Sequence, residues 1–542
     1  MLITRMRHAG VALCLLALAP AVLSAQQGTL TMGIRQDATV PVPYVGPATA
    51  GNALVTDQLF LRLTGLGTSG STVGDDVMVP ELARRWFRQD SLTVDFEIDP
   101  RARWHDGTPV TARDVVFGWE SLRKPVLGVT QAPFALIRSV EALDQRTVRF
   151  RFHRRSSEQV YVAGFLVQPL PAHLLAAIPA DSLTTSEYAR APIGNGPYRF
   201  VRREPGQFVE LRADSSFFLG KPGIARLIFR LVPTSDAQVN LILSGELDVM
   251  TDAPASALPQ LSRSTTHRIL HSPGSFITYL LFNSRSPADT GTPHPILSDA
   301  RVREALTLAL DRNRIASTSF GPGAETPRSL RSQAWYWLGG GKDAGRADRD
   351  RAMRLLREAG WRDTDGDGIL DRNGKQLALT VIYPVQSPLF AGIGVQVEQM
   401  WRAIGVAVQL EPIDGPVWLQ QRRAGRFDVD IAGAEQDPSP SSLSQSWSCA
   451  SAAEAGSSNV GRWCDPEFDR LRDAAPASAD PVVGFRVALE RMAEWAPMVP
   501  IAPTNRVVVH RRYDNVTVRT SRAWTALWRW QIRPGAALPR DR

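Results

Sequence analysis

The chain has 542 residues, 44% of them hydrophobic, and a formal net charge of +8. At this length a single core would be unusual, so two or three lobes are expected, and the ordinary composition without low-complexity tracts excludes a fibrous or disordered chain. The arginines are scattered in pairs such as Arg84-Arg85 and Arg422-Arg423 and form no long basic run, so no nucleic-acid partner is predicted.

The first 25 residues have the layout of a secretory signal peptide. Arg5 and Arg7 form a short basic region, residues 11–23 an apolar core, and Ser24-Ala25 a small-residue cleavage site. The apolar run is too short to span a bilayer, and no later stretch is long enough. The residues before Cys14 do not form a lipoprotein cleavage box, so no lipid anchor is expected. We therefore predict a signal peptide at 1–25 and a soluble mature protein in the periplasm or otherwise exported.

A strand, a tight turn and a capped helix are predicted one after another near residue 100. They follow a first strand at 29–34 and a first helix at 52–61. Apolar residues alternate with polar ones through 92–98, which is the period of a strand with one buried face. Asp106-Gly107 supplies a turn in which glycine accepts a positive φ. Thr111 with Asp114 three residues later then forms a capping box that begins a helix.

Residues 104–117 read WHDGTPVTARDVVF. This segment closely resembles the signature of the oligopeptide, dipeptide and nickel-type solute-binding proteins of ABC importers, which are solute-binding protein family 5. Two further phrases resemble the same family: GNGPYRF at 194–200, with Asn195 where threonine is usual, and DARVREALTLALDR at 299–312. The resemblance covers almost all of residues 27–535. Within the signature, His105 is expected to pack or to form hydrogen bonds rather than to act as a catalyst.

The resemblance implies an α/β fold of the periplasmic-binding-protein type, cluster C. Such a fold has two lobes with mixed sheets and a hinge, plus a small extra domain. The expected division gives residues 26–70, 192–283 and 507–542 to lobe I, residues 71–191 to the small extra domain, and residues 284–506 to lobe II. The chain thus leaves lobe I and returns to it at the end.

The remaining elements are predicted from periodicity and from start and stop signals. Ser235 and Gln238 predict a capping box for a helix that ends at Gly245. Strands alternate with helices after residue 299, which favours α/β units with largely parallel sheets. The expected strands are 147–152, 198–200, 246–249, 378–382, 406–410, 427–431 and 506–510. The expected helices are 172–175, 299–310, 347–359, 392–404, 418–424, 466–474 and 482–495.

Cys449 and Cys464 are the only cysteines of the predicted mature chain. An even pair at modest separation in an exported protein is most simply a disulfide. A two-cysteine metal site is the alternative, although no histidine accompanies the pair. The residues around both cysteines also resemble the disulfide-bearing loop of the dipeptide-binding branch.

Four aspartates stand at calcium-loop spacing. Asp363, Asp365, Asp367 and Asp371 occupy the first, third, fifth and ninth positions, with a glycine at the sixth. The twelfth position, where such loops need a bidentate glutamate, is Gly374. The pattern therefore indicates either a structural calcium site or a polar turn between the helix at 347–359 and the strand near 378. No other cofactor is expected.

The ligand loop implied by the resemblance is residues 431–438. In peptide-binding members, an aspartate shortly before an Asp-Pro pair accepts the ammonium group of the peptide, because an unpaired buried charge is very costly. Ala434 stands at that position here, and Glu435 or Asp437 is the candidate substitute. If neither serves, sugars, modified peptides or other small solutes become the expected ligands.

Three more residues are ligand-contact candidates. Trp335 belongs to an aromatic cluster that would either line the cleft, where flat rings stack on peptide or sugar, or pack in a core. Tyr44 and Asn283 complete the candidate set. The sequence contains no nucleophile elbow, no zinc-binding helix and no phosphate-cradling glycine loop, so it is not expected to be an enzyme.

The function implied is that of an exported solute-binding component of an ABC importer. It would capture peptides or a related small solute in the cleft between the lobes. Its expected partners are that ligand, the permease subunits and their ATPases, with the membrane reached only through the permease and the protein itself a monomer. A sensor or chaperone-like binder with the same fold is the alternative, and a secreted hydrolase is disfavoured by the missing catalytic set.

Overall fold

The computed structural model describes residues 27–46, 49–124, 127, 129, 131–322, 324, 326–327, 345–435, 437–440, 442–454, 457–518, 524 and 526–541. The predicted signal peptide and Trp335 lie outside the described residues. Among the helices described, none combines the length and the apolar character needed to cross a membrane.

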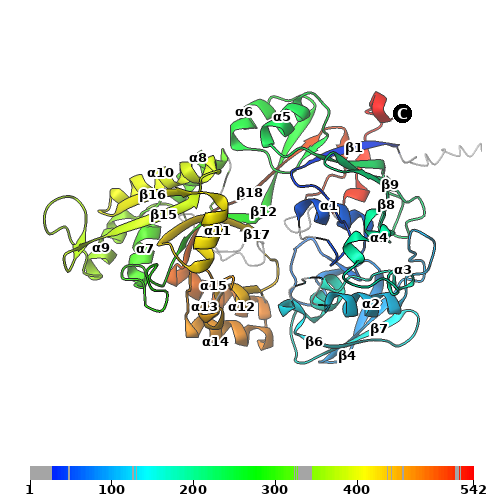
Figure 1. Cartoon of the computed structure of the whole chain (residues 1–542), viewed down its shortest axis with the longest axis horizontal. Helices are drawn as coiled ribbons and strands as arrows, with labels where there is room; N and C mark the ends of the chain where they lie inside the picture. Colours follow the sequence, from blue (N-terminus) through cyan, green and yellow to red (C-terminus); the bar gives the residue numbers. More distant parts are fainter. Residues whose placement is uncertain are drawn as a thin grey trace, which may run out of the picture.

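Two lobes and a small domain are visible in Figure 1. One ten-stranded sheet runs through both lobes in the order β16-β15-β17-β12-β18-β11-β1-β10-β9-β8. Lobe I holds β1 (Gln27–Ile34), β8 (Tyr198–Glu204), β9 (Phe208–Ala213), β10 (Ile224–Leu231), β11 (Val249–Met250), α1 (Ala50–Leu59), α5 (Ser235–Leu243) and α6 (Leu258–Leu261). Short pairs β2 (Thr64–Leu66) with β3 (Met78–Pro80) and β19 (Tyr513–Asp514) with β20 (Gln531–Ile532) accompany them.

Lobe II holds the other end of the sheet and most of the helices. Its elements are β15 (Ala378–Pro384), β16 (Ala407–Ile413), β17 (Val429–Glu435), α7 (Ala300–Leu308), α8 (Arg312–Phe320), α9 (Arg349–Glu358), α10 (Pro388–Arg402), α11 (Gly415–Ala424), α12 (Ser442–Trp447), α13 (Cys449–Ala453), α14 (Pro466–Ala474) and α15 (Pro481–Trp495), with the hairpin β13 (Asp371–Arg372) and β14 (Lys375–Gln376). Strands β15, β16 and β17 are mutually parallel, as predicted for this lobe, whereas the sheet as a whole is mixed.

Two long strands, β12 (His267–Phe282) and β18 (Met498–His510), connect the lobes. They pair antiparallel with each other, and the register shifts between Pro273 and Tyr279. Residues 276–282 of β12 already pair with β17 of lobe II, so β12 enters lobe II before the predicted boundary at residue 283. An irregular ladder at this point has fewer hydrogen bonds to resist bending, which suits a hinge. The sequence pattern predicts only residues 506–510 of this pair of strands.

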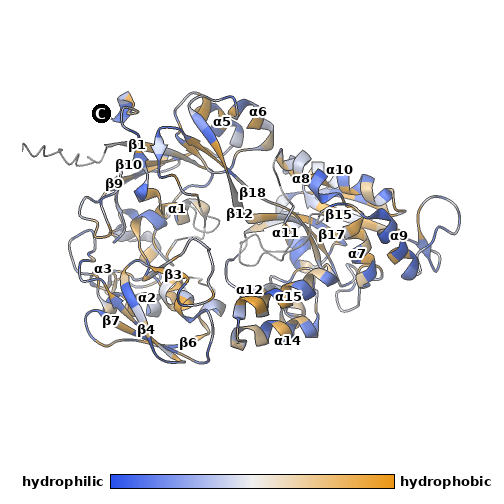
Figure 2. Ribbon diagram, turned by 180° about the vertical axis from the view of Figure 1, so that it is seen from behind, coloured by the Kyte–Doolittle hydropathy of each residue, from blue (hydrophilic) through white to orange (hydrophobic). Residues whose placement is uncertain are grey.

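Both faces of the lobe II sheet are buried at residues 277–282 of β12 and 429–432 of β17, which explains why these segments are mostly apolar. Leu280 and Ile431 pack with the helices α7 to α10, whereas Ile277 and Ala432 pack with α12, α14 and α15. Figure 2 shows the corresponding apolar colouring on β12, β15 and β17 and on α12 and α15. Strands covered on both faces need no polar alternation, so their hydrophobic runs stabilise two layers of helices at once.

The small domain contains a four-stranded antiparallel sheet in the order β4-β5-β7-β6. The elements are β4 (Ala83–Asp90), β5 (Thr93–Ile98), β6 (Ile137–Ala142), β7 (Thr147–Phe152), α2 (Ala112–Leu122), α3 (Ala172–Leu175) and α4 (Glu187–Arg190). As predicted, α2 begins with a capping box of Thr111 and Asp114. The predicted capping box of α5 is wrong, because the capping oxygen comes from Thr234 and the Gln238 amide instead donates to the Val232 carbonyl.

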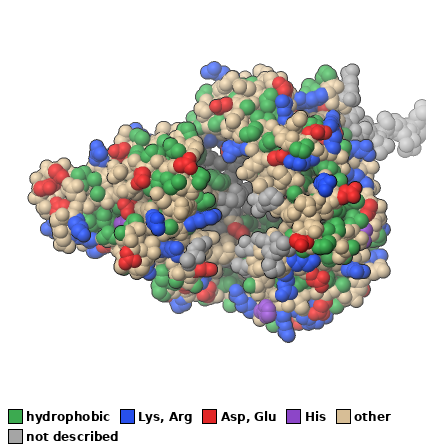
Figure 3. Space-filling model, viewed as in Figure 1, with side chains coloured by type: hydrophobic (Ala, Val, Ile, Leu, Met, Phe, Trp, Pro, Cys, Tyr) green, Lys and Arg blue, Asp and Glu red, His purple; other side chains and the backbone are tan. Residues whose placement is uncertain are grey.

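Lobe I and lobe II face each other across a hollow (Figure 3). Positive and negative side chains are interspersed on the face shown, without a gathering of one sign. This distribution agrees with the absence of a long basic run in the sequence.

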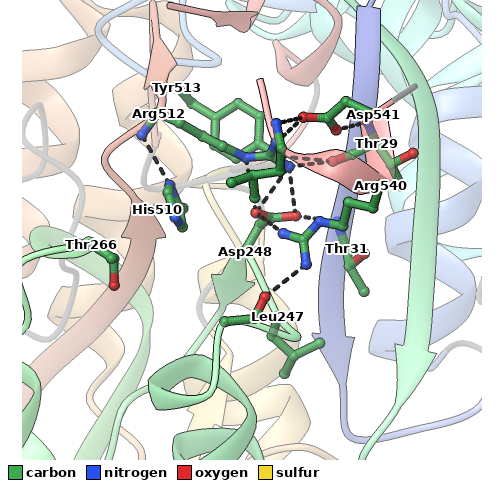
Figure 4. Close-up of polar contacts among 12 residues, drawn as sticks. Thr29, Thr31, Leu247, Asp248, Thr266, His510, Arg512, Tyr513, Arg540 and Asp541 are labelled. Atoms are coloured by element: carbon green, nitrogen blue, oxygen red, sulfur yellow. Dashed lines mark hydrogen bonds and ion pairs between the residues drawn. The ribbon is translucent and has the colours of Figure 1, made fainter. Parts of the chain in front are cut away.

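A buried ionic network fastens the C-terminal segment to β1 (Figure 4). The Asp248 carboxylate accepts hydrogen bonds from the Thr31 amide at 2.9 Å, from Arg512 Nε at 3.2 Å and from Arg540 Nη2 at 2.6 Å. Asp541 in turn accepts from the Thr29 amide at 2.8 Å. Because buried charges are tolerated only when they are paired and hydrogen-bonded, these contacts define where the returning chain must dock.

Candidate ligand-binding site

The hollow between the lobes is the candidate ligand-binding site. Helices α11 and α12 follow the carboxyl ends of β16 and β17, and both lie on the side of lobe II that faces lobe I (Figure 1). Ligands of open α/β sheets bind outside the carboxyl ends of parallel strands, because loops and helix starts converge there. The parallel strands β1 and β11 of lobe I also have carboxyl ends, which lead into the residues near Arg35 and Asp252.

The small domain and lobe II are in contact near the predicted ligand loop. The Thr72 hydroxyl lies 2.7 Å from Glu158 Oε1 and 3.5 Å from the carbonyl oxygen of Pro438, which belongs to lobe II. Val73 is buried in the hydrophobic cluster to which α12, α14 and α15 contribute. Residues 71–74 therefore reach from the small domain to the end of the 431–438 loop, and sequence reasoning gave no signal for this contact.

The structure places the three residues of the predicted ammonium site together at the carboxyl end of β17. Ala434 pairs with Ile277 of the hinge strand β12, and Glu435 is the last residue of β17. Asp437 follows in the loop with an exposed side chain, and its Oδ1 accepts a hydrogen bond from the Ser439 amide at 2.7 Å. The side chain of Glu435 is not among those described. Their position agrees with a role at the cleft, and the role itself stays a prediction.

Tyr44 and Asn283 have structural contacts elsewhere. The Tyr44 hydroxyl donates to the Leu166 carbonyl at 2.7 Å and also contacts the Gln168 amide, which fastens its loop to the small domain. Asn283 is fully buried, and its Nδ2 donates to the carbonyls of Gly425 and Phe427, both at 2.8 Å. Its backbone pairs at the start of β17, at the opposite end of the strand from the predicted ligand loop. These contacts give no support to a ligand role for either residue.

The predicted disulfide between Cys449 and Cys464 is confirmed. It links the first residue of α13 to the segment that precedes α14. The Cys449 amide donates to Asp469 Oδ2 at 3.0 Å, so the same region is also joined by a hydrogen bond to α14. The bond thus supports the helical layer that covers one face of the lobe II sheet.

The aspartate loop has the geometry of a hydrogen-bonded turn. Asp363, Asp365 and Asp367 are exposed and offer oxygens within 4.8 Å of one another. Asp371 is not in that group, and its Oδ2 accepts from the Thr364 amide at 2.9 Å. Carboxylate oxygens of the other three accept backbone amides of the same loop, for example Gly366 on Asp363 at 2.7 Å. A structural calcium ion stays a prediction.

His105 connects the signature turn to the glycine-rich segment at 194–196. Its Nε2 lies 3.0 Å from the Gly196 carbonyl, and the Gly194 amide donates to its Nδ1 at 3.1 Å. Burial lowers the pKa of His105 to about 4, so the ring is neutral near pH 7. A neutral imidazole with both nitrogens in hydrogen bonds fits the expected packing role.

Comparison with known proteins identifies the fold and the family. Residues 77–455 match the bacterial extracellular solute-binding proteins, family 5. A putative ABC transporter peptide-binding protein of Brucella ovis is 29% identical over 412 residues, which is 74% of each chain. The oligopeptide-binding protein AppA of Bacillus subtilis is 28% identical over 348 residues, or 62% of each chain.

Solved structures agree with the expected two-lobed fold. The Bacillus subtilis AppA structure, determined with a nonapeptide, superposes with a TM-score of 0.74 at 22% identity, covering 94% of this chain and 99% of that one. NikZ from Campylobacter jejuni, determined with Ni(L-His), gives a TM-score of 0.73 at 22% identity and covers 93% and 99%. The predicted fold class is thereby confirmed.

Proposed function

Because the chain belongs to the bacterial extracellular solute-binding proteins of family 5, we propose that it captures peptides between its lobes and delivers them to the permease of an ABC importer. The family match over residues 77–455 is the observation that carries this proposal. That segment includes the signature turn, the hinge strand β12 and the ligand loop. The same membership makes the protein a binder of solutes and not a hydrolase.

Peptide is the favoured solute because peptide-binding proteins recur among the relatives. The Brucella relative is described as peptide-binding, and AppA as oligopeptide-binding. Binding would close the lobes through a population shift, which requires more contacts with the solute in the closed form than in the open form. The protein would act in the periplasm as a monomer and reach the membrane through the permease and its ATPases.

A solute without a free amino group is the second candidate. It is favoured by Ala434, which brings no carboxylate to the position where peptide-binding members have an aspartate. Modified peptides and sugars belong to this class. The two candidates differ in whether the cleft must neutralise an ammonium group.

The first experiment identifies the solute directly. Native mass spectrometry of the purified protein should show a co-purified peptide, and a thermal-shift screen should show the melting temperature rising with peptides that bind the folded state. A co-purified solute of another class, with no stabilisation by any peptide, would contradict the peptide assignment.

The second experiment tests Glu435 as the ammonium partner. Glu435→Ala should weaken the binding of a peptide with a free amino terminus by at least about tenfold, because a buried ammonium loses its charged acceptor. Calorimetric titration with the co-purified peptide and its N-acetylated form measures the effect. Glu454→Ala, an exposed change in the same lobe, is the matched control. Equal affinity of wild type for the free and acetylated peptides would show that no carboxylate serves this purpose.

A further inference from the structure

An arginine on the hinge strand β18 is buried without an acceptor. The Arg506 side chain is 4% exposed, and within the described part of the chain its Nε and Nη2 atoms have no hydrogen-bond partner. Its backbone carbonyl accepts from the Ala253 amide at 2.9 Å, which places it beside the segment that follows β11. A buried guanidinium without an acceptor is costly, so this position calls for an explanation.

Two charged residues accompany Arg506 at the carboxyl edge of the lobe I sheet. Arg35 follows β1 and Asp252 follows β11, and Arg35 Nη1 lies 4.0 Å from Asp252 Oδ2. Burial raises the pKa of Asp252, although its side chain is 58% exposed, and both arginines oppose this rise. Arg35 and Arg506 carry two positive charges and Asp252 carries one negative charge, so the group has a net positive charge.

Lobe II covers this group of charges. Gly321 ends α8 with a φ of 86°, and a Cβ at this glycine would lie 2.7 Å from Leu258 Cδ1 and 3.9 Å from Arg506 Nη2. Leu258 belongs to α6 of lobe I. The backbone of lobe II at residue 321 therefore packs against Leu258 of lobe I and lies next to the guanidinium of Arg506.

We propose that Arg506, with Arg35 beside it, binds a carboxylate of the solute when the lobes close. The planar guanidinium presents paired N–H donors that match the two oxygens of a carboxylate, and charge-assisted hydrogen bonds of this kind are strong. The carboxylate supplies the acceptor that Arg506 lacks and neutralises the remaining positive charge. Asp252 holds Arg35 near the site without neutralising both arginines. This inference deepens the proposed function, since it assigns a chemical group to the captured solute.

In a peptide, the carboxylate comes from the C-terminus or from an acidic side chain. Three tetrapeptide libraries separate these sources: one with a free carboxyl terminus and no acidic residues, one amidated with acidic residues, and one amidated without them. Wild type and Arg506→Gln are mixed with each library, and retained peptides are counted by native mass spectrometry. We expect wild type to favour one of the first two libraries over the third by about tenfold or more, and Arg506→Gln to lose that preference. If wild type and Arg506→Gln retain the three libraries in the same proportions, the proposal is overturned.

Two further variants and a melting curve separate recognition from folding. Arg506→Lys keeps the charge but lacks the paired donors, so an intermediate preference is expected. Arg226→Gln removes the same charge from the β10 strand of the same lobe and should leave the preference unchanged. Without solute, Arg506→Gln should melt at or above the wild-type temperature, because it removes an unpaired buried cation. A clearly lower melting temperature would assign Arg506 a structural role and overturn the proposal.

The carboxylate site can fail independently of the peptide assignment. If no library binds, the peptide assignment is wrong. The carboxylate site is then tested with acetate as the only ligand. Acetate should raise the melting temperature of wild type above that in chloride at equal ionic strength, and should not do so for Arg506→Gln. Equal shifts in the two proteins would overturn the carboxylate site as well.

Discussion

Asp114 shows how much of one residue's role can be inferred from its neighbours in sequence. The spacing to Thr111 predicts a capping box, and its Oδ2 accepts the Thr111 amide at 2.8 Å. The same carboxylate also accepts from Trp104 Nε1 at 3.3 Å and, through Oδ1, from the Ala172 amide at 2.9 Å. These two contacts depend on tertiary structure, so they could not be predicted from the local pattern that predicts the cap.

His105 makes the stability of the fold depend on pH. Its pKa is about 4 in the folded protein and about 6.5 in an unfolded chain. Between these values only the unfolded state takes up the proton, so the contribution of His105 to stability should fall as the pH drops from about 6.5 to about 4 and should change no further below that range. His105→Gln should reduce this dependence by up to one proton.

Urea unfolding of wild type and His105→Gln, at several pH values across that window, checks the expectation. Burial also lowers the pKa of His510 to about 4. Because His510 is unchanged in His105→Gln, its contribution to the pH dependence of stability should remain in the variant. Parallel stability curves for the two proteins would show that His105 takes up its proton equally in the folded and unfolded states.

At the scale of elements, the sequence predicts helices better than the connecting strands. The bounds 466–474 for α14 are those observed, because Pro466 and the Asp465 cap mark its start. Neither β12 nor most of β18 is predicted, since Pro273 and Gly274 interrupt the pattern of β12 where it passes from one sheet neighbour to another. Ala434 and Asp437 could be placed at the cleft only through resemblance, whereas Arg506 needed the folded structure.

The Cys449–Cys464 disulfide should stabilise the helical layer of α12 to α14. It spans 15 residues, and closing a loop of that size is worth about 3 kcal/mol in the entropy account of cross-links. Cys449→Ser with Cys464→Ser should therefore lose a few kcal/mol of stability, measured by thermal melting. Hydrogen exchange should rise within residues 442–474 and remain near wild type in the small domain. Uniform loss of protection over both lobes would contradict a local role.

At the scale of the whole molecule, contacts between the lobes should contribute to solute affinity. Val73 of the small domain is buried in the lobe II cluster, so its methyl groups contribute to the arrangement in which the small domain touches lobe II. Val73→Ala should weaken binding about fivefold to tenfold, because closure loses apolar burial that the open form never had.

Calorimetric titration with the co-purified solute measures this effect. Val79→Ala, in the same domain but exposed, is the matched control. The melting temperature without solute should be similar in both variants and wild type. Full affinity in Val73→Ala would mean that the observed contact between residues 71–74 and lobe II is absent from the liganded state.

The ionic network around Asp248 determines the order in which an exported chain can fold. Thr29 and Asp541 are joined by a hydrogen bond although 512 positions separate them. The strands β12, β15, β16 and β17 can assemble much earlier, because all of them are complete by residue 435. Lobe I, in contrast, keeps the docking surface of β1 open until Arg512, Arg540 and Asp541 have emerged from the translocation channel. During translocation, the edge of β1 around Thr29, which β11 does not pair with, is therefore open to a holding chaperone or to another unfinished chain.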